Sequence, residues 1–150
     1  MRIFRLTFLG IAITSIAACN DASAPLQPVN YALTSVNGNP LPTTMTPIPE
    51  SPVVLSGTFL LDGGSHALAH EQRRDMSGNE YDWNVRYRYT ITGSKVTFNY
   101  DPPCGGPAAL CAIIPTGTID GRHLFIDYSG GQNALVYDYQ SFPMINLPPG

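Results

Sequence analysis

Two cysteines close together in the second half of the chain are the first residues with evident chemistry. Cys104 and Cys111 flank a stretch of Gly, Pro, Ala and Leu. In an exported protein such a pair predicts a disulfide that closes a short loop, which stabilises a fold by about 2–3 kcal/mol. Metal binding by the same thiolates is the alternative, but it needs further ligands that no nearby Cys or His supplies. We therefore predict a disulfide between Cys104 and Cys111 and no metal site.

Histidines form a second candidate group. On a helix, His66 and His70 would share a face at a spacing that can chelate zinc, and Glu71 could assist. On a strand the two side chains also share a face but lie about 13 Å apart, too far for one ion. The chain has no His-Glu-x-x-His motif, and His123 is remote in sequence. We therefore interpret the histidines as solvated or hydrogen-bonded side chains.

An aromatic stripe is the third candidate. Tyr81, Trp83, Tyr87 and Tyr89 all stand at odd positions, which places them on one face of a strand. They could line a cavity for a small apolar ligand, as aromatic walls do in some barrels. They could equally be plain core, because aromatic side chains are enriched in strands and bury a large area. The sequence favours the interpretation as core, and a ligand cavity remains the alternative.

Catalytic motifs are missing from the sequence. It has no Gly-x-Ser-x-Gly motif and no glycine-rich phosphate loop that opens a helix. Its 11 acidic residues are scattered and biased to turns. A net charge of −3 also lacks the basic surface that nucleic acids require. We predict a non-enzymatic protein that uses no cofactor and binds no nucleic acid.

The N-terminus has the features of an export signal. Two cations among residues 1–5 precede an uncharged run from Leu6 to Ala18, which is typical of a secretory signal peptide. This run is shorter than the roughly 20 residues of a membrane span. It ends in Ile16-Ala17-Ala18-Cys19, which resembles the bacterial lipobox, where an aliphatic and two small residues precede the lipidated cysteine.

That resemblance implies a lipid anchor on Cys19. Residues 1–18 would be removed, the thiol would carry a diacylglycerol, and the new α-amine would carry a fatty acid such as palmitate. Two or three acyl chains anchor a protein stably, whereas one binds only marginally. Asn20, in place of the Asp that marks inner-membrane retention, favours the outer membrane of the bacterial cell envelope. The alternative is an ordinary signal peptide with a chance cysteine, or an uncleaved leader.

Prolines and alternating residues divide the rest of the chain into strands. No proline occurs in 53–101 or 116–142, and proline is excluded from central strands. Apolar and polar residues alternate within these windows, and short Gly-containing turns separate the runs, as in antiparallel hairpins. The predicted strands are 31–36, 53–61, 65–75, 80–91, 95–100, 112–119, 122–128 and 134–140.

Two of these strands have alternatives. Pro115 interrupts 112–119, so that strand lies at an edge or starts later. Segment 65–75 contains good helix formers and Ser65 could cap a helix. It lacks an apolar stripe at helical spacing, which favours a strand.

These elements predict an all-β fold, an antiparallel up-and-down meander of about eight strands. Closing such a sheet into a small barrel removes its exposed edges. The runs 31–38, 55–63 and 89–98, with their strand and turn pattern, look like the small lipocalin-like β-barrel lipoproteins of bacterial envelopes, most of which have no assigned function. The expected organisation is a signal peptide at 1–18, a lipidated N-terminus and tether at 19–29, a barrel domain at 30–142 and a tail at 143–150.

The expected function follows from this organisation. We expect a non-enzymatic barrel, held at the membrane through Cys19, that binds a small apolar ligand. The alternative is a protein-interaction or inhibitor module of the envelope. Its contact surface would be the proline-rich segment 40–52 and the loop 101–111, and its partner would be an envelope protein.

Overall fold

The regular structure of the chain is entirely β in the part that the computed structural model describes, residues 27–45, 51–103, 113–130 and 135–142. The strands are β1 (Val29–Val36), β2 (Asn39–Pro40), β3 (Thr43–Thr44), β4 (Val53–Leu61), β5 (His66–Arg74), β6 (Glu80–Thr92), β7 (Lys95–Tyr100), β8 (Thr116–Asp120), β9 (His123–Asp127) and β10 (Val136–Phe142). No helix in these ranges is long and apolar enough to cross a membrane.

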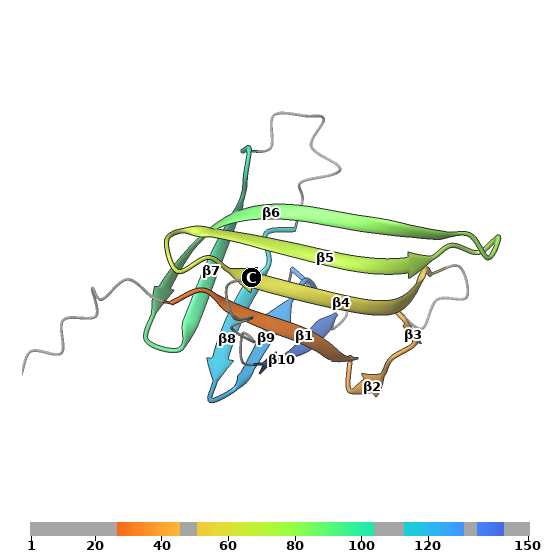
Figure 1. Cartoon of the computed structure of the whole chain (residues 1–150), viewed down its shortest axis with the longest axis horizontal. Coiled ribbons are helices and arrows are strands. Elements are labelled where there is room, and N and C mark those ends of the chain that lie inside the picture. The colour runs from red at the N-terminus through yellow and green to blue at the C-terminus, as the bar shows by residue number, and fades with distance from the viewer. Residues whose placement is uncertain (1–26, 46–50, 104–112, 131–134, 143–150) are drawn as a thin grey trace, which may run out of the picture.

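Eight of the described strands close into an antiparallel barrel (Figure 1). Strands β4 to β10 pair in chain order, and β10 then pairs with β1. The closure comes from β1 against β4, where Val29 lies opposite Leu61 and Ala32 opposite Thr58. The short strands β2 and β3 extend the sheet beside β1 and β4. The predicted meander and its closure into a barrel are therefore confirmed.

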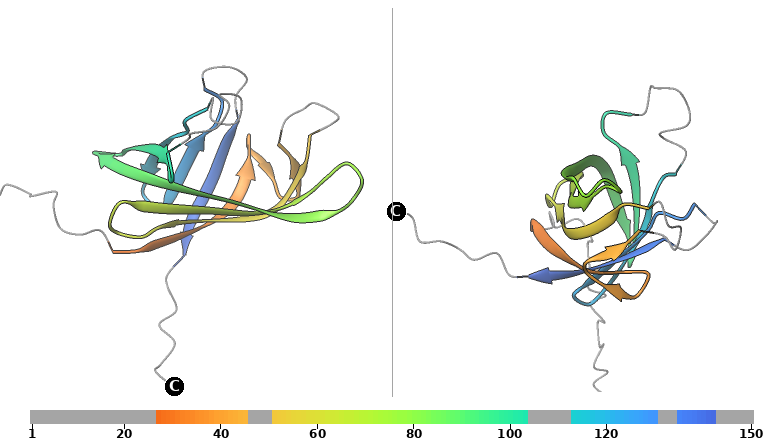
Figure 2. Two further views of the ribbon diagram at one scale, coloured as in Figure 1. Left: turned by 90° about the horizontal axis from the view of Figure 1, so that it is seen from above. Right: turned by 90° about the vertical axis from the view of Figure 1, so that its right-hand side faces the viewer.

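The strands β4, β5 and β6 cross steeply over β8, β9 and β10, so that the barrel has two layers (Figures 1 and 2). The β5–β6 hairpin reaches beyond the rest of the barrel at one end. This extension follows from the 13 residues of β6, which pair with β5 along the whole length of that strand, from His66 opposite Arg88 to Arg74 opposite Glu80.

The two segments with alternatives are now decided. Segment 65–75 contains β5, so the strand prediction is confirmed. Strand β8 begins at Thr116, directly after Pro115, which confirms the later start. The strands β2 and β3 were not predicted, because each has only two residues and lies among prolines.

A two-residue turn joins β1 to β2. Asn37 has a φ of 52° and Gly38 a φ of 76°, and positive values at both central residues are the requirement of a type I′ hairpin turn. Asn37 also ties this turn to β10. Its backbone N–H donates to the Val136 carbonyl at 2.7 Å, and its Oδ1 accepts the Val136 N–H at 2.8 Å.

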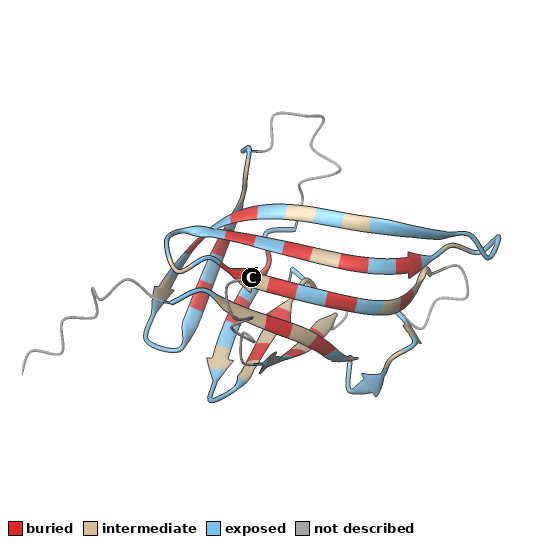
Figure 3. Ribbon diagram, viewed as in Figure 1, coloured by how far each residue is buried: buried red, intermediate tan, exposed pale blue. Residues whose placement is uncertain are grey.

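Alternate residues of the strands are buried and form the core inside the barrel (Figure 3). Phe59 lies at the centre of an aromatic group, with ring centroids 5.5 Å from Phe98, 5.6 Å from Tyr139 and 6.2 Å from Tyr87. The buried hydrophobic residues are Tyr31, Leu33, Val36, Val54, Phe59, Leu61, Ala67, Ala69, Tyr87, Tyr89, Val96, Phe98, Leu124, Ile126, Tyr137 and Tyr139.

Candidate ligand site inside the barrel

A buried ion pair lies inside the barrel on β5. Glu71 and Arg73 are two residues apart, so both point to the same face of the strand, and that face is the interior. Glu71 is 0% exposed and Arg73 is 8% exposed. The Arg73 Nε–H donates to Glu71 Oε2 at 2.9 Å. Both charges are thus removed from water and compensate each other.

The space for Glu71 comes from a missing side chain on β4. Gly57 lies directly opposite Glu71 in the β4–β5 register. A Cβ at Gly57 would come within 3.2 Å of Glu71 Cγ and 3.1 Å of Leu33 Cδ2. Such contacts are shorter than normal packing allows, so the glycine leaves room for the Glu71 side chain against the wall.

Trp83 covers the ion pair on the side of β6. It lies opposite Glu71 in the β5–β6 register, and the guanidinium carbon of Arg73 is 4.0 Å from the centroid of its ring. This is the geometry of a cation–π interaction. Trp83 is half-buried. Along β6 it lies between the buried Tyr87 and the exposed Tyr81 at the extended end of the hairpin.

Five tyrosine hydroxyls and one carboxylate oxygen inside the barrel have no hydrogen-bond partner within the described chain. They belong to Glu71 (Oε1), Tyr87, Tyr89, Tyr128, Tyr137 and Tyr139. Buried polar atoms of folded proteins nearly always find a partner in protein, water or ligand, and one left unpaired costs about 1–3 kcal/mol. Tyr87 lies near Tyr128 and Tyr137 near Glu71, and a partner from outside the chain, water or a ligand, would complete the remaining hydrogen bonds.

Four of the tyrosines lie around the ion pair. The ring centroids of Tyr128 and Tyr137 are 5.0 Å apart, and those of Tyr137 and Tyr139 are 6.2 Å apart. Burial raises the pKa of Tyr87, of Tyr128 just after β9 and of Tyr137 and Tyr139 on β10, and the charge of Glu71 adds to each of these shifts. Tyr89 is not part of this group: its pKa is raised by burial and by Asp62 in the β4–β5 turn, and not by Glu71. We call Glu71, Arg73, Tyr87, Tyr128, Tyr137 and Tyr139 the interior polar cluster.

Burial determines the protonation of this cluster. It raises the pKa of each of the four tyrosines above the ordinary value of 10.0, so all are neutral phenols near pH 7. Burial also raises the pKa of Glu71. The charge of Arg73 opposes this shift, as does the Tyr137 hydroxyl, which is near Glu71 without reaching hydrogen-bond geometry. With Arg73 Nε 2.9 Å from Glu71 Oε2, the ion pair gives the cluster one anion and one cation, beside four groups that can both donate and accept a hydrogen bond.

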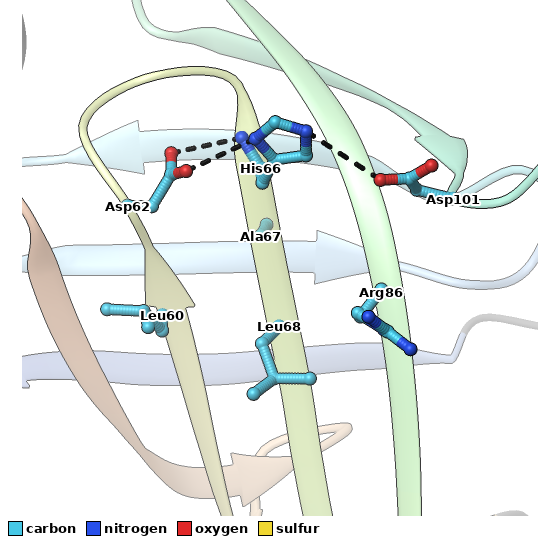
Figure 4. A pocket seen from close by; sticks show the side chains of 7 residues that line it. All are labelled: Leu60, Asp62, His66, Ala67, Leu68, Arg86 and Asp101. Atoms are coloured by element: carbon cyan, nitrogen blue, oxygen red, sulfur yellow. Dashed lines mark hydrogen bonds and ion pairs between the residues drawn. The ribbon is translucent and has the colours of Figure 1, made fainter.

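A groove of about 380 Å³ lies on the outer face of β4–β6 (Figure 4). His66 stands at one end, with Nδ1 3.3 Å from Asp62 Oδ2 and Nε2 3.7 Å from Asp101 Oδ2. Asp62 Oδ1 also accepts the backbone N–H groups of Gly64 and His66, and these bonds lower its pKa. Leu60, Leu68 and Arg86 line the rest. Asp62 thus holds the β4–β5 turn, and His66 lies between the carboxylates of Asp62 and Asp101.

The predicted site residues are placed as follows. Tyr87 and Tyr89 are buried core, whereas Trp83 is half-buried and Tyr81 is 38% exposed, towards the extended end of β6. The role of this stripe in ligand binding stays a prediction. Cys19, Cys104 and Cys111 lie outside the described residues, as do 1–18, 143–150 and parts of the two predicted contact segments 40–52 and 101–111.

The histidines have neighbours on the barrel surface. His70 Nδ1 is 2.8 Å from Asn84 Oδ1, and His123 Nδ1 is 2.9 Å from Asp138 Oδ1. Within the described ranges, His, Cys, Asp and Glu side chains nowhere gather in a group of three or more that could hold a metal ion.

Sequence reasoning missed the role of Glu71 and Arg73. It considered Glu71 only as a helper to the histidines, but Glu71 points to the interior and His70 to the outside. A signal was present, since Glu71 and Arg73 continue the odd-numbered positions of Ala67 and Ala69, which are the buried face of β5. Charged residues in phase with a buried face indicate an internal polar site.

Comparison of the chain with protein-family models, with curated proteins and with solved structures gives no match.

Proposed function

We propose that the chain is a non-enzymatic, lipid-anchored β-barrel of the bacterial cell envelope whose interior binds a small ligand. The observation that carries the binding function is the set of buried polar atoms without protein partners around Glu71 and Arg73. Ligand sites are mostly apolar, with a few placed polar groups that fix orientation. The aromatic walls and the interior polar cluster have this composition.

The interior polar cluster restricts the chemical class of ligand, which the sequence suggested to be small and apolar. A wholly apolar molecule would fill space but leave the four phenol hydroxyls of the cluster and Glu71 Oε1 unpaired, at about 1–3 kcal/mol for each group. A molecule that combines an apolar body with hydrogen-bonding groups removes that cost. We therefore propose an amphipathic small molecule rather than a purely apolar one.

The ligand is tested by native mass spectrometry of the full chain as cells produce it. We expect a non-covalent mass adduct that survives mild extraction and disappears on unfolding. In Tyr137→Phe, which removes one hydroxyl of the cluster, the adduct should decrease, whereas the surface variant Asp120→Asn should retain it. A folded chain without any adduct, in which water completes the cluster, would contradict the proposal.

The anchor is tested separately at Cys19. Cells grown with labelled palmitate should label the chain, and the chain should fractionate with membranes. Cys19→Ala should abolish both the label and the membrane association. Membrane association that persists in Cys19→Ala would show that this residue is not the anchor.

A further inference from the structure

The interior polar cluster is electrically neutral as a unit, and we infer that it selects an uncharged ligand with a planar apolar ring and a hydroxyl or amide group. This inference rests on the proposed ligand-binding function and deepens it. The chemical class of the ligand follows from the charge of the cluster, its hydrogen-bonding groups and the aromatic side chains around it.

Charge balance excludes ions from the site. Glu71 and Arg73 neutralise each other at 2.9 Å, and among the described residues they are the only charged side chains that are buried. A charged ligand would bring a third charge into the barrel without a counter-charge. Removing that charge from water costs more than neutral hydrogen bonds return. An uncharged ligand carries no such penalty.

Hydrogen-bond capacity requires a ligand that donates and accepts. Glu71 Oε1 can only accept and has no partner in hydrogen-bond geometry, so a hydroxyl or N–H of the ligand would complete it. The hydroxyls of Tyr87, Tyr128, Tyr137 and Tyr139 can each donate or accept. A hydroxyl or amide supplies both kinds of group without a charge, which a carboxylate or an ammonium group does not.

The aromatic side chains around the cluster favour a ligand with a planar ring. Tyr128 meets Tyr137 edge to face, with an angle of 65° between the ring planes, and Phe59 meets Tyr139 at 64°. A planar ring in the ligand would gain stacking or edge-to-face contacts with such a group, worth more than its buried area alone. One face of the indole of Trp83 is already covered by the Arg73 guanidinium, so a ring beside it would change the surroundings of this indole.

Four probes with the same ring test the inference on the full chain: benzyl alcohol, toluene, benzoate and benzylammonium. Trp83 is the single tryptophan of the chain, so its fluorescence reports binding at the site directly. We expect benzyl alcohol to bind about tenfold or more tightly than either ion, and more tightly than toluene. Benzoate or benzylammonium binding as tightly as benzyl alcohol would overturn the inference while leaving a ligand site in place.

Glu71→Gln provides the sharper test, because it keeps the shape of the side chain and leaves the Arg73 charge uncompensated. The preference should then change from benzyl alcohol to benzoate. Glu80→Gln is the matched control, since it removes a carboxylate from the exposed pair with Arg74, and it should leave the order of the probes unchanged. An unchanged order in Glu71→Gln as well would overturn the charge argument.

If Glu71→Gln fails to fold, Tyr137→Phe replaces it as the test. This variant keeps the site neutral, and it should weaken benzyl alcohol without weakening toluene. Equal loss of both probes would overturn the inference. Failure of all four probes to bind the unmodified chain would overturn the proposed ligand site itself, which is a different result from a wrong order of affinities.

Discussion

Arg73→Met should be among the most damaging single substitutions in the barrel. It removes the counter-charge from Glu71, which is 0% exposed, and it removes the cation from the face of Trp83. Breaking a buried ion pair from one side costs about 3–5 kcal/mol, because the remaining charge is left uncompensated. We expect a loss of this size in the free energy of unfolding near neutral pH.

The loss should depend on pH in a defined direction. Burial raises the pKa of Glu71, and without Arg73 this pKa must rise further. A carboxyl with a raised folded-state pKa contributes its full stability below the unfolded-state pKa of about 4.3 and loses it as pH rises through the folded-state pKa. Arg73→Met should therefore be less destabilising at about pH 5, where Glu71 can take up a proton, than at about pH 8.

Urea unfolding followed by Trp83 fluorescence measures these losses. Arg74→Met is the matched control, since Arg74 Nη2 is 2.8 Å from Glu80 Oε1 and the two side chains are 46% and 45% exposed. An exposed pair contributes about 0–1 kcal/mol. Adding Glu71→Leu to Arg73→Met removes the stranded charge and should recover most of the loss.

The reasoning fails if the two arginine variants lose the same stability. It also fails if the loss in Arg73→Met is independent of pH, or if Glu71→Leu does not recover stability in the double variant. Each of these results would mean that Glu71 has access to water in solution, contrary to a pair enclosed in the barrel.

Three further predictions concern packing, a turn and the cysteines. Gly57→Ala should cost about 1–3 kcal/mol of unfolding free energy, because its Cβ would meet the buried side chains of Leu33 and Glu71 at 3.1–3.2 Å and these would have to shift. By contrast, Gly64→Ala, which meets only an exposed aspartate at 3.4 Å, should change it by less than about 0.5 kcal/mol. Thermal unfolding of Asn37→Ala should show a loss of about 1–2 kcal/mol from the positive φ and the bonds to β10, and full stability there would contradict the turn. A non-reducing peptide map should show Cys104 linked to Cys111, and two free thiols would refute the disulfide.

The fold could be predicted from the sequence because its strands are long and strictly alternating. Strand β6 is the clearest case, since its odd-numbered positions from Tyr81 to Ile91 are aromatic or aliphatic and the positions between them are polar. Closure of the barrel could be predicted because an open sheet would leave exposed edge strands, which closure removes. The closing contact between Val29–Ala32 and Thr58–Leu61 could not be located this way, because nothing local to either segment specifies its partner.

The site was harder to predict because its charged residues stand at inward-facing positions of a strand, where apolar residues are ordinarily expected. Glu71 and Arg73 have room inside because the residue beside Glu71 on β4 is Gly57 and the neighbouring inward positions of β5 are Ala67 and Ala69. The bulky phenols come from other strands, above all β10. A small wall facing a large one is how a narrow barrel fits its taper. The position of the cluster is therefore a property of the closed barrel, and no single strand of the sequence contains it.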